Sequence, residues 1–81
     1  MTPDEVLQRH TVETVRWLRG RLGLTRAGFA LRSAVTPATV KAWEEGTHPL
    51  APLSRSRIVP MLAAHLATEE GGAWLRARAG E

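Results

Sequence analysis

Arginine and threonine side chains gather where two short helices are expected to begin. Thr25 precedes Arg26, and Thr36 lies three residues before Thr39. Guanidinium and hydroxyl groups donate hydrogen bonds to phosphate oxygens, and so do the free backbone amides in the first turn of a helix. Because these donors recur at two helix starts, the sequence predicts a surface that binds phosphate groups.

Side chains that could catalyse a reaction or ligate a metal ion are few and scattered. Asp4 is the only aspartate, and the chain contains no cysteine. The histidines lack the pair spacing of a metal site, and no serine lies in a nucleophile motif. These histidines and serines are His10, His48, His65, Ser33, Ser54 and Ser56. We therefore expect no enzyme, no metal site and no cofactor.

Charge and length narrow the class of protein further. The formal net charge is +3, because 11 Lys and Arg residues outnumber 8 Asp and Glu residues. A positive excess on so small a chain favours a polyanionic partner. The 81 residues suffice for one domain. No apolar run is long enough to cross a membrane, and the lack of cysteine fits the cytoplasm, where we expect the protein.

Capping signals and apolar spacing predict an all-α fold of about five helices. Thr2 begins the first helix with a Thr-x-x-Glu capping box that ends at Glu5. This helix is expected to run to about Leu22, and Gly20 weakens its last turn. Gly23 follows it, in a position where helices commonly end with a left-handed residue.

The second and third expected helices are short and close together. Thr25 caps the second helix, over about 26–33. Thr36 caps the third helix, which has Pro37 at its first position and ends at Gly46. The side chains expected to face the core are Phe29, Ala30, Val40 and Trp43.

Proline and glycine interrupt the pattern in the last third of the chain. A fourth helix is expected within 54–67, and Pro60 requires that it either begin late, near Ser56, or kink. The pair Gly71-Gly72 is expected to break the chain. A short fifth helix then remains over 73–79.

Six motifs follow one another through the middle of the chain. They are Val15-x-x-Leu18-Arg19, Leu22-Gly23-Leu24-Thr25, Phe29-Ala30, Val35-Thr36-Pro37-x-Thr39-Val40, Trp43-Glu44-x-Gly46, and Pro49 or Pro52. Through these motifs, Val15 to about Leu62 resembles the lambda-repressor-like, or Xre-type, family of bacterial and phage DNA-binding domains. The resemblance implies a core over 15–67, a helical extension over 1–14 and a tail with a short helix over 68–81.

The two short helices have the layout of a helix-turn-helix, in which the second helix enters the major groove of double-stranded DNA. The resemblance therefore implies a transcription regulator, and we expect an (auto)repressor that reads DNA with the helix at about 37–45. It also implies a structural salt bridge between Arg19 and Glu44. The residues expected at the DNA are Arg26, Thr36, Pro37, Ala38, Thr39, Lys41, Ala42, Thr47 and His48.

Base recognition by this helix is expected to depend on few groups. Pro37, Ala38 and Ala42 cannot form a bidentate hydrogen bond with a base edge, whereas Lys41 can approach a guanine. Alanine can contact a thymine methyl group. We therefore expect specificity to come from Lys41, from methyl contacts and from DNA shape.

Three positions depart from the family pattern. Arg26 replaces the usual Gln, which often contacts a phosphate, and can keep that role. Gly28 replaces the usual Glu and removes half of a capping box. Ala34 replaces the usual Gly where a positive φ is needed, so we expect the turn to be reshaped.

Partners other than DNA are also expected. A homodimer would place two reading helices on successive major grooves, about 34 Å apart. Candidate interface residues lie at both ends of the chain, and Trp74 could equally close the core. Apart from Trp74 they are Val6, Leu7, Val12 and Leu75.

Two alternative functions use the same fold. An antitoxin-type or other protein-interaction module would bind a toxin or another partner through the residues before Val15 or after Ala67. A stricter alternative gives up DNA altogether and uses the third helix as a docking face.

Overall fold

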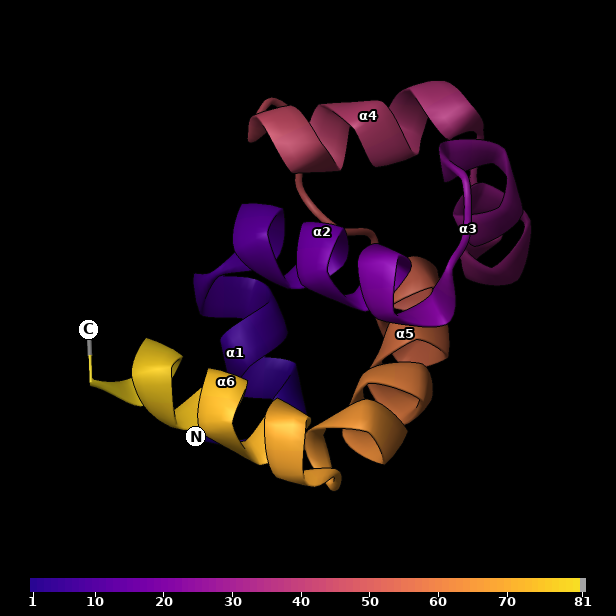
Figure 1. Ribbon diagram of the computed structural model, residues 1–81. Coiled ribbons are helices and arrows are strands. Elements are labelled where there is room, and N and C mark those ends of the chain that lie inside the picture. Colours follow the sequence, from indigo (N-terminus) through magenta and orange to yellow (C-terminus); the bar gives the residue numbers. More distant parts are fainter. Residues whose placement is uncertain (81) are drawn as a thin grey trace.

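Six helices make up the computed structural model, which describes residues 1–80 and contains no strand there. They are α1 (Pro3–Arg9), α2 (Thr11–Leu22), α3 (Arg26–Ser33), α4 (Pro37–Glu45), α5 (Pro52–Leu66) and α6 (Glu69–Ala79). The all-helical class is confirmed, but the count is six and not five. Figure 1 shows α2 through the middle, with α4 on one side and α1 and α6 on the other. Within the described chain, no helix combines the length and the apolar character needed to span a bilayer.

The first helical segment is broken at His10, so the expectation of one helix to Leu22 is wrong. His10 leaves the helical conformation with φ −129° and ψ 51°. A straight helix over 3–22 would be about 30 Å long, and the longest extent of the whole domain is 30 Å. The bend instead brings Val6 and Leu7 back into the core, where both are fully buried.

One apolar core connects α1 to α5. Its buried side chains are Val6, Leu7, Val15, Leu18, Phe29, Ala30, Val40, Trp43, Ile58, Leu62 and Leu66. The four side chains of α3 and α4 expected to face inward are all among them. Because α1 contributes two fully buried residues, the first 14 residues belong to the packed domain and do not form an appended arm.

Four of the six helices begin at a threonine whose hydroxyl caps the helix. Thr2, Thr25, Thr36 and Thr68 each accept a hydrogen bond from the backbone N–H three residues further on. Such a cap contributes about 1 kcal/mol. At Thr25 the donor is Gly28, which has no side chain to return the bond. The expected starts of α1, α3 and α4 are thus confirmed, and Thr68 is an additional cap.

α5 starts earlier than expected and continues through Pro60. Its first residue is Pro52, which suits the first position of a helix because that position needs no N–H donor. Pro60 cannot donate to the preceding turn, a loss of about 3 kcal/mol in a helix interior. Ile58 and Leu62 lie on either side of it and are fully buried. Their packing offsets this loss. Of the two expected alternatives, the late start near Ser56 is wrong.

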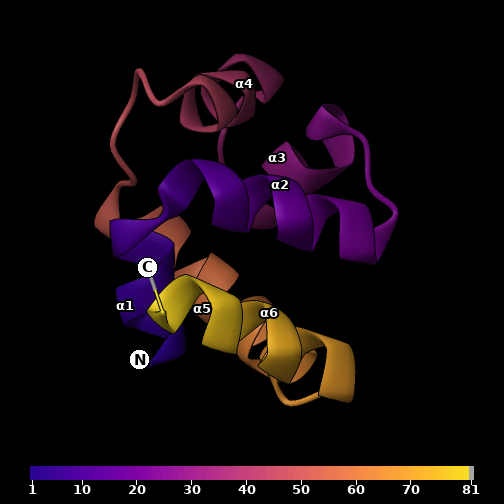
Figure 2. The same ribbon diagram turned by 60° about the vertical axis from the view of Figure 1, so that its left-hand side comes forward.

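α6 begins at Glu69, ahead of the two glycines expected to break the chain. A β-carbon at Gly71 would overlap the carbonyl oxygen of His65. The first turn of α6 therefore packs directly on the end of α5, as both views of the fold show (Figures 1 and 2). Gly71 permits this close approach and does not end a helix.

Trp74 connects α6 to α2. Its ring stacks on that of Trp17, with centroids 4.6 Å apart and an interplanar angle of 14°. The Arg21 guanidinium lies 5.9 Å from the centroid of Trp17, and Arg78 lies 5.3 Å from that of Trp74. Arg21 also pairs with Glu70 at 2.9 Å. Trp74 therefore packs within the domain, as do Val6 and Leu7. Part of the Trp74 surface stays exposed.

Candidate nucleic-acid interface

The direction of α4 is set by a short turn after α3. Ala34 ends α3 with φ 61° and ψ 42°, and it is the only residue besides glycine with a positive φ among residues 1–80. The backbone N–H of Val35 donates to the carbonyl of Ala30 at 3.0 Å. The expectation that Ala34 would reshape the turn is therefore wrong. The chain keeps the left-handed conformation, which costs an alanine about 1 kcal/mol.

α4 has one buried and one open side. Val40, Trp43 and Glu44 are buried, and the Trp43 indole N–H donates to the carbonyl of Pro49 at 3.3 Å. Figures 1 and 2 both show α4 at the edge of the molecule. The side that faces away from the core is thus open to a partner. Its side chains are Pro37, Ala38, Lys41 and Glu45, which are exposed, and Ala42, which is half-buried.

Hydroxyl groups lie at both ends of α4. The hydroxyls of Thr36 and Thr39 are 3.1 Å apart at its start, and Thr36 accepts from the backbone N–H of Thr39. Thr47 follows the other end, where its hydroxyl donates to the carbonyl of Ala42 at 3.3 Å, and the exposed His48 comes next. The structure therefore separates these four residues into two pairs, about 14 Å apart along the helix.

Two arginines bind the buried carboxylate of Glu44, on the core-facing side of α4. Arg19 donates from Nε to Glu44 Oε2 at 2.7 Å and from Nη2 to Oε1 at 3.0 Å. Arg26 donates from Nη2 to the same Oε1 at 3.3 Å. The structure thus contains the bidentate pair implied for Arg19 and Glu44. The hydrogen bond from Arg26 to Glu44 was not expected. The only signal for it in the sequence is a second arginine at the start of the adjoining helix.

The charge of this cluster follows from the groups around Glu44. Burial alone would raise the pKa of the Glu44 carboxyl, but hydrogen bonds and positive charge from Arg19 and then Arg26 outweigh it and lower the pKa. The hydrogen bond to Glu44 raises the pKa of Arg19. At neutral pH the cluster therefore holds two positive charges and one negative charge.

Several other charged side chains have no ion-pair partner in the described part of the chain. On α3 and α4 these are Arg32, Lys41 and Glu45. Lys41 is exposed on the open side of α4. An unpaired, exposed ammonium group is available to an anionic partner, whereas Glu45 opposes such a partner with its negative charge.

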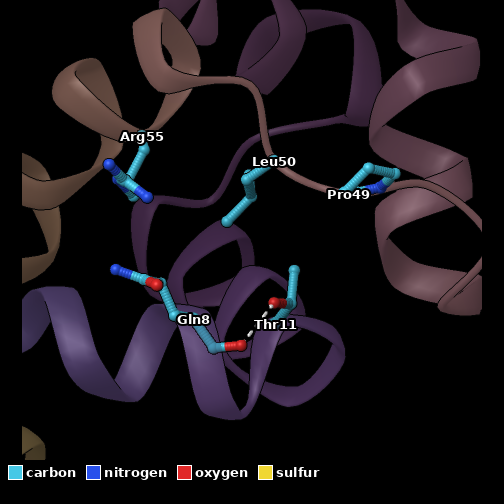
Figure 3. A pocket seen from close by; sticks show the side chains of 5 residues that line it. All are labelled: Gln8, Thr11, Pro49, Leu50 and Arg55. Carbon is cyan, nitrogen blue, oxygen red and sulfur yellow. Dashed lines mark hydrogen bonds between the residues drawn. The ribbon is translucent and has the colours of Figure 1, made fainter.

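A small cavity lies where α1 and the start of α2 meet the loop before α5 (Figure 3), and none of the predicted DNA residues lines it. Its volume of about 210 Å³ is below the 300–1,000 Å³ typical of ligand pockets. Asp4 already binds its polar donors, Gln8 at 2.8 Å and Arg55 at 3.4 Å. In residues 1–80, no three His, Asp or Glu side chains gather as a metal ion would need. The cavity lining is Gln8, Thr11, Pro49, Leu50 and Arg55.

Comparison with known proteins adds nothing to this geometry. The chain matches no protein-family model, no curated protein and no solved structure. Two features of the chain itself bear on its function, the open side of α4 and the two-arginine cluster on Glu44.

Proposed function

We propose that this protein is a sequence-specific DNA-binding regulator of transcription, an (auto)repressor, in which α3 and α4 form a helix-turn-helix. The observation that carries the proposal is the open side of α4, which bears Lys41 while the opposite side is anchored in the core by Val40 and Trp43. An α-helix about 10–12 Å across fits a major groove about 12 Å wide. The resemblance of residues 15–62 to Xre-type domains supports the same proposal.

Phosphate contacts would hold the protein on the duplex. In this proposal Arg26 and the hydroxyls of Thr36 and Thr39 contact the backbone near the start of α4. Thr47 and His48 contact it beyond the other end of the helix. Such contacts supply affinity and orientation without sequence choice, and the net charge of +3 favours them.

Sequence choice would depend chiefly on Lys41. Its ammonium group can donate to O6 and N7 of a guanine, and the methyl group of Ala38 can contact a thymine. One copy of the chain therefore makes few base contacts. We infer that two copies bind together as a homodimer, with the two α4 helices about 34 Å apart in successive major grooves.

The proposal is tested by titrating the purified protein with the duplex upstream of its own gene and with a scrambled duplex of equal length and base composition. Both titrations are made at low and at physiological salt, since phosphate contacts weaken steeply with salt. A preference for the upstream duplex that persists at physiological salt supports a sequence-specific repressor. Equal binding of both duplexes, lost at physiological salt, contradicts it.

A protein-interaction module of the antitoxin type is the second candidate, and Leu31 favours it. This α3 side chain is 82% exposed, and an apolar group in water suits a protein partner better than phosphate. The end regions expected to bind such a partner expose less apolar surface, because Val6 and Leu7 are fully buried and Trp74 stacks on Trp17. Copurification of a partner with the wild-type chain but not with Leu31→Glu would support this candidate.

A further inference from the structure

Every nitrogen of the Arg19 guanidinium has an acceptor inside the domain. Nε and Nη2 bind the two oxygens of Glu44 at 2.7 and 3.0 Å. Nη1 donates to the carbonyl of Leu24 at 3.2 Å. Arg19 therefore has its geometry fixed on two sides, and it holds the Glu44 carboxylate in one orientation.

Arg26 uses its guanidinium quite differently. Only Nη2 has an acceptor, which is Glu44 Oε1 at 3.3 Å. Nε is buried without a hydrogen-bond partner, and Nη1 has no acceptor among residues 1–80 either. The side chain is nevertheless 42% exposed. Arg26 is thus fixed at one nitrogen, open to solvent, and has donors to spare.

The excess charge of the cluster belongs to Arg26. The Glu44 carboxylate can neutralise one cation, and both of its oxygens are taken by the shorter bonds from Arg19. Arg26 is also the first residue of α3, where the backbone N–H groups lack helical acceptors and the helix dipole is positive. A net positive charge therefore lies on a half-exposed side chain, and because Nε is buried, the donors left for a ligand are those of Nη1 and the second N–H of Nη2.

We propose that Glu44 is a positioning residue for phosphate binding. Arg19 fixes Glu44, Glu44 fixes the Arg26 guanidinium at the start of α3, and Arg26 donates to a phosphate oxygen. The ligand chemistry is a phosphate group, and its assignment to the backbone of a duplex rests on the proposed function. Arg26 need not release Glu44 to bind, because a guanidinium carries five N–H donors. A side chain held in place beforehand loses less entropy on binding.

If Glu44 positions Arg26, Glu44→Gln should change the DNA affinity in the opposite direction to that expected from charge alone. Glu44→Gln removes a negative charge close to the phosphate, so by charge alone it would strengthen DNA binding. If Glu44 acts by holding Arg26, the same substitution weakens binding. The direction of the change thus separates positioning from electrostatics.

A double-mutant cycle on Arg26 and Glu44 tests the inference, with a random-sequence duplex as the probe. Arg26→Gln is expected to weaken binding about ten-fold and to lower the slope of log K against log salt by about one. Glu44→Gln is expected to weaken binding when Arg26 is present and to have no such effect beside Arg26→Gln. Tighter binding by Glu44→Gln, or an equal loss in both backgrounds, overturns the inference.

A second variant covers the case in which Glu44→Gln fails to fold, which circular dichroism reveals. Arg26→Lys keeps the positive charge but cannot bind Glu44 and a phosphate with one planar group. It is expected to bind the duplex several-fold more weakly, while the matched Arg32→Lys, at an exposed position without an ion pair, leaves binding unchanged. Equal binding by Arg26→Lys and the wild type overturns the inference.

Inorganic phosphate separates the two sources of the ligand. If phosphate raises the Tm of the wild type more than chloride of equal ionic strength, and does not do so for Arg26→Gln, the site takes free phosphate. If only the duplex binding depends on Arg26, the ligand is the phosphodiester backbone. A wild type that binds no duplex contradicts the proposed function, and the phosphate-dependent Tm then decides this inference alone. No effect of Arg26→Gln in either assay overturns it.

Discussion

Gly71 approaches His65 so closely that no β-carbon fits between the first turn of α6 and the His65 carbonyl oxygen in the last turn of α5. This contact lies between backbones, so a flexible side chain cannot relieve a clash there. The attachment of α6 to the rest of the domain therefore depends on the absence of one carbon atom at position 71.

We expect Gly71→Ala to lower the free energy of unfolding by about 1–3 kcal/mol, as overpacking does in well-packed sites. Urea unfolding followed by circular dichroism measures the change. Gly20→Ala in α2 is the matched control, because a β-carbon there meets nothing within 4 Å. It should stabilise the domain by about 0.5–1 kcal/mol, since alanine is the better helix former. A neutral Gly71→Ala would contradict the close approach.

Ala34→Gly is expected to stabilise the protein by about 1 kcal/mol. Ala34 has a φ of 61°, which glycine adopts without the strain that a β-carbon introduces. Ala27→Gly is the control, because Ala27 is an exposed residue in the first turn of α3, where glycine is still destabilising, by less than the about 1 kcal/mol of a helix interior. The two substitutions should therefore shift the urea midpoint in opposite directions, and a shared direction would argue against the left-handed turn.

Glu44 should make the stability of the domain fall in acid. Its folded pKa lies below the ordinary value because of Arg19 and Arg26, so its stabilising effect is complete above the unfolded pKa. That effect is lost as the pH falls through the lower folded pKa. We expect Tm to drop as the pH falls below the unfolded glutamate pKa of about 4.3, and Glu44→Gln to reduce this drop while lowering Tm at neutral pH. The control Glu45→Gln, at an exposed position without an ion pair in residues 1–80, should lower the neutral Tm far less.

Truncating Glu44 should destabilise the fold strongly. Glu44→Ala leaves Arg19 facing a buried site without its carboxylate, and breaking a buried ion pair costs about 3–5 kcal/mol. Denaturant unfolding measures this loss. A Glu44→Ala variant as stable as the wild type would show that the two-arginine cluster does not hold α2, α3 and α4 together.

Lys41→Ala should change which DNA is preferred. Losing its contact with a base edge is expected to narrow the gap between the preferred and the scrambled duplex by about 1–3 kcal/mol. Glu45→Gln, one turn further along α4, removes an unpaired negative charge and should strengthen binding of both duplexes alike. Titrations of the two variants against both duplexes check this. An unchanged gap for Lys41→Ala would remove it from the base-reading surface.

The elements that could be predicted from the sequence are those whose signals are local. Thr25 and Thr36 cap α3 and α4, and Gly46 ends α4, because each of these residues acts on the backbone within a few positions of itself. The expected bounds of both helices therefore agree with the structure. The capping box at Thr2 is local in the same sense.

The features that could not be predicted depend on distant parts of the chain. His10 breaks the first helix so that Val6 and Leu7 can pack, and Gly71 lies against His65 from a different helix. The same holds for the candidate site. That Arg26 shares Glu44 with another arginine follows from how three helices meet, and no spacing along the chain encodes it.

The stacked rings of Trp17 and Trp74 give the domain an internal optical reporter. Two indoles 4.6 Å apart couple electronically, and the coupling disappears as soon as α6 leaves α2. The third tryptophan, Trp43, belongs to α4, and its side chain is buried in the core. Near-ultraviolet circular dichroism and fluorescence can therefore follow the release of α6 and the opening of the core as separate events in the unlabelled protein.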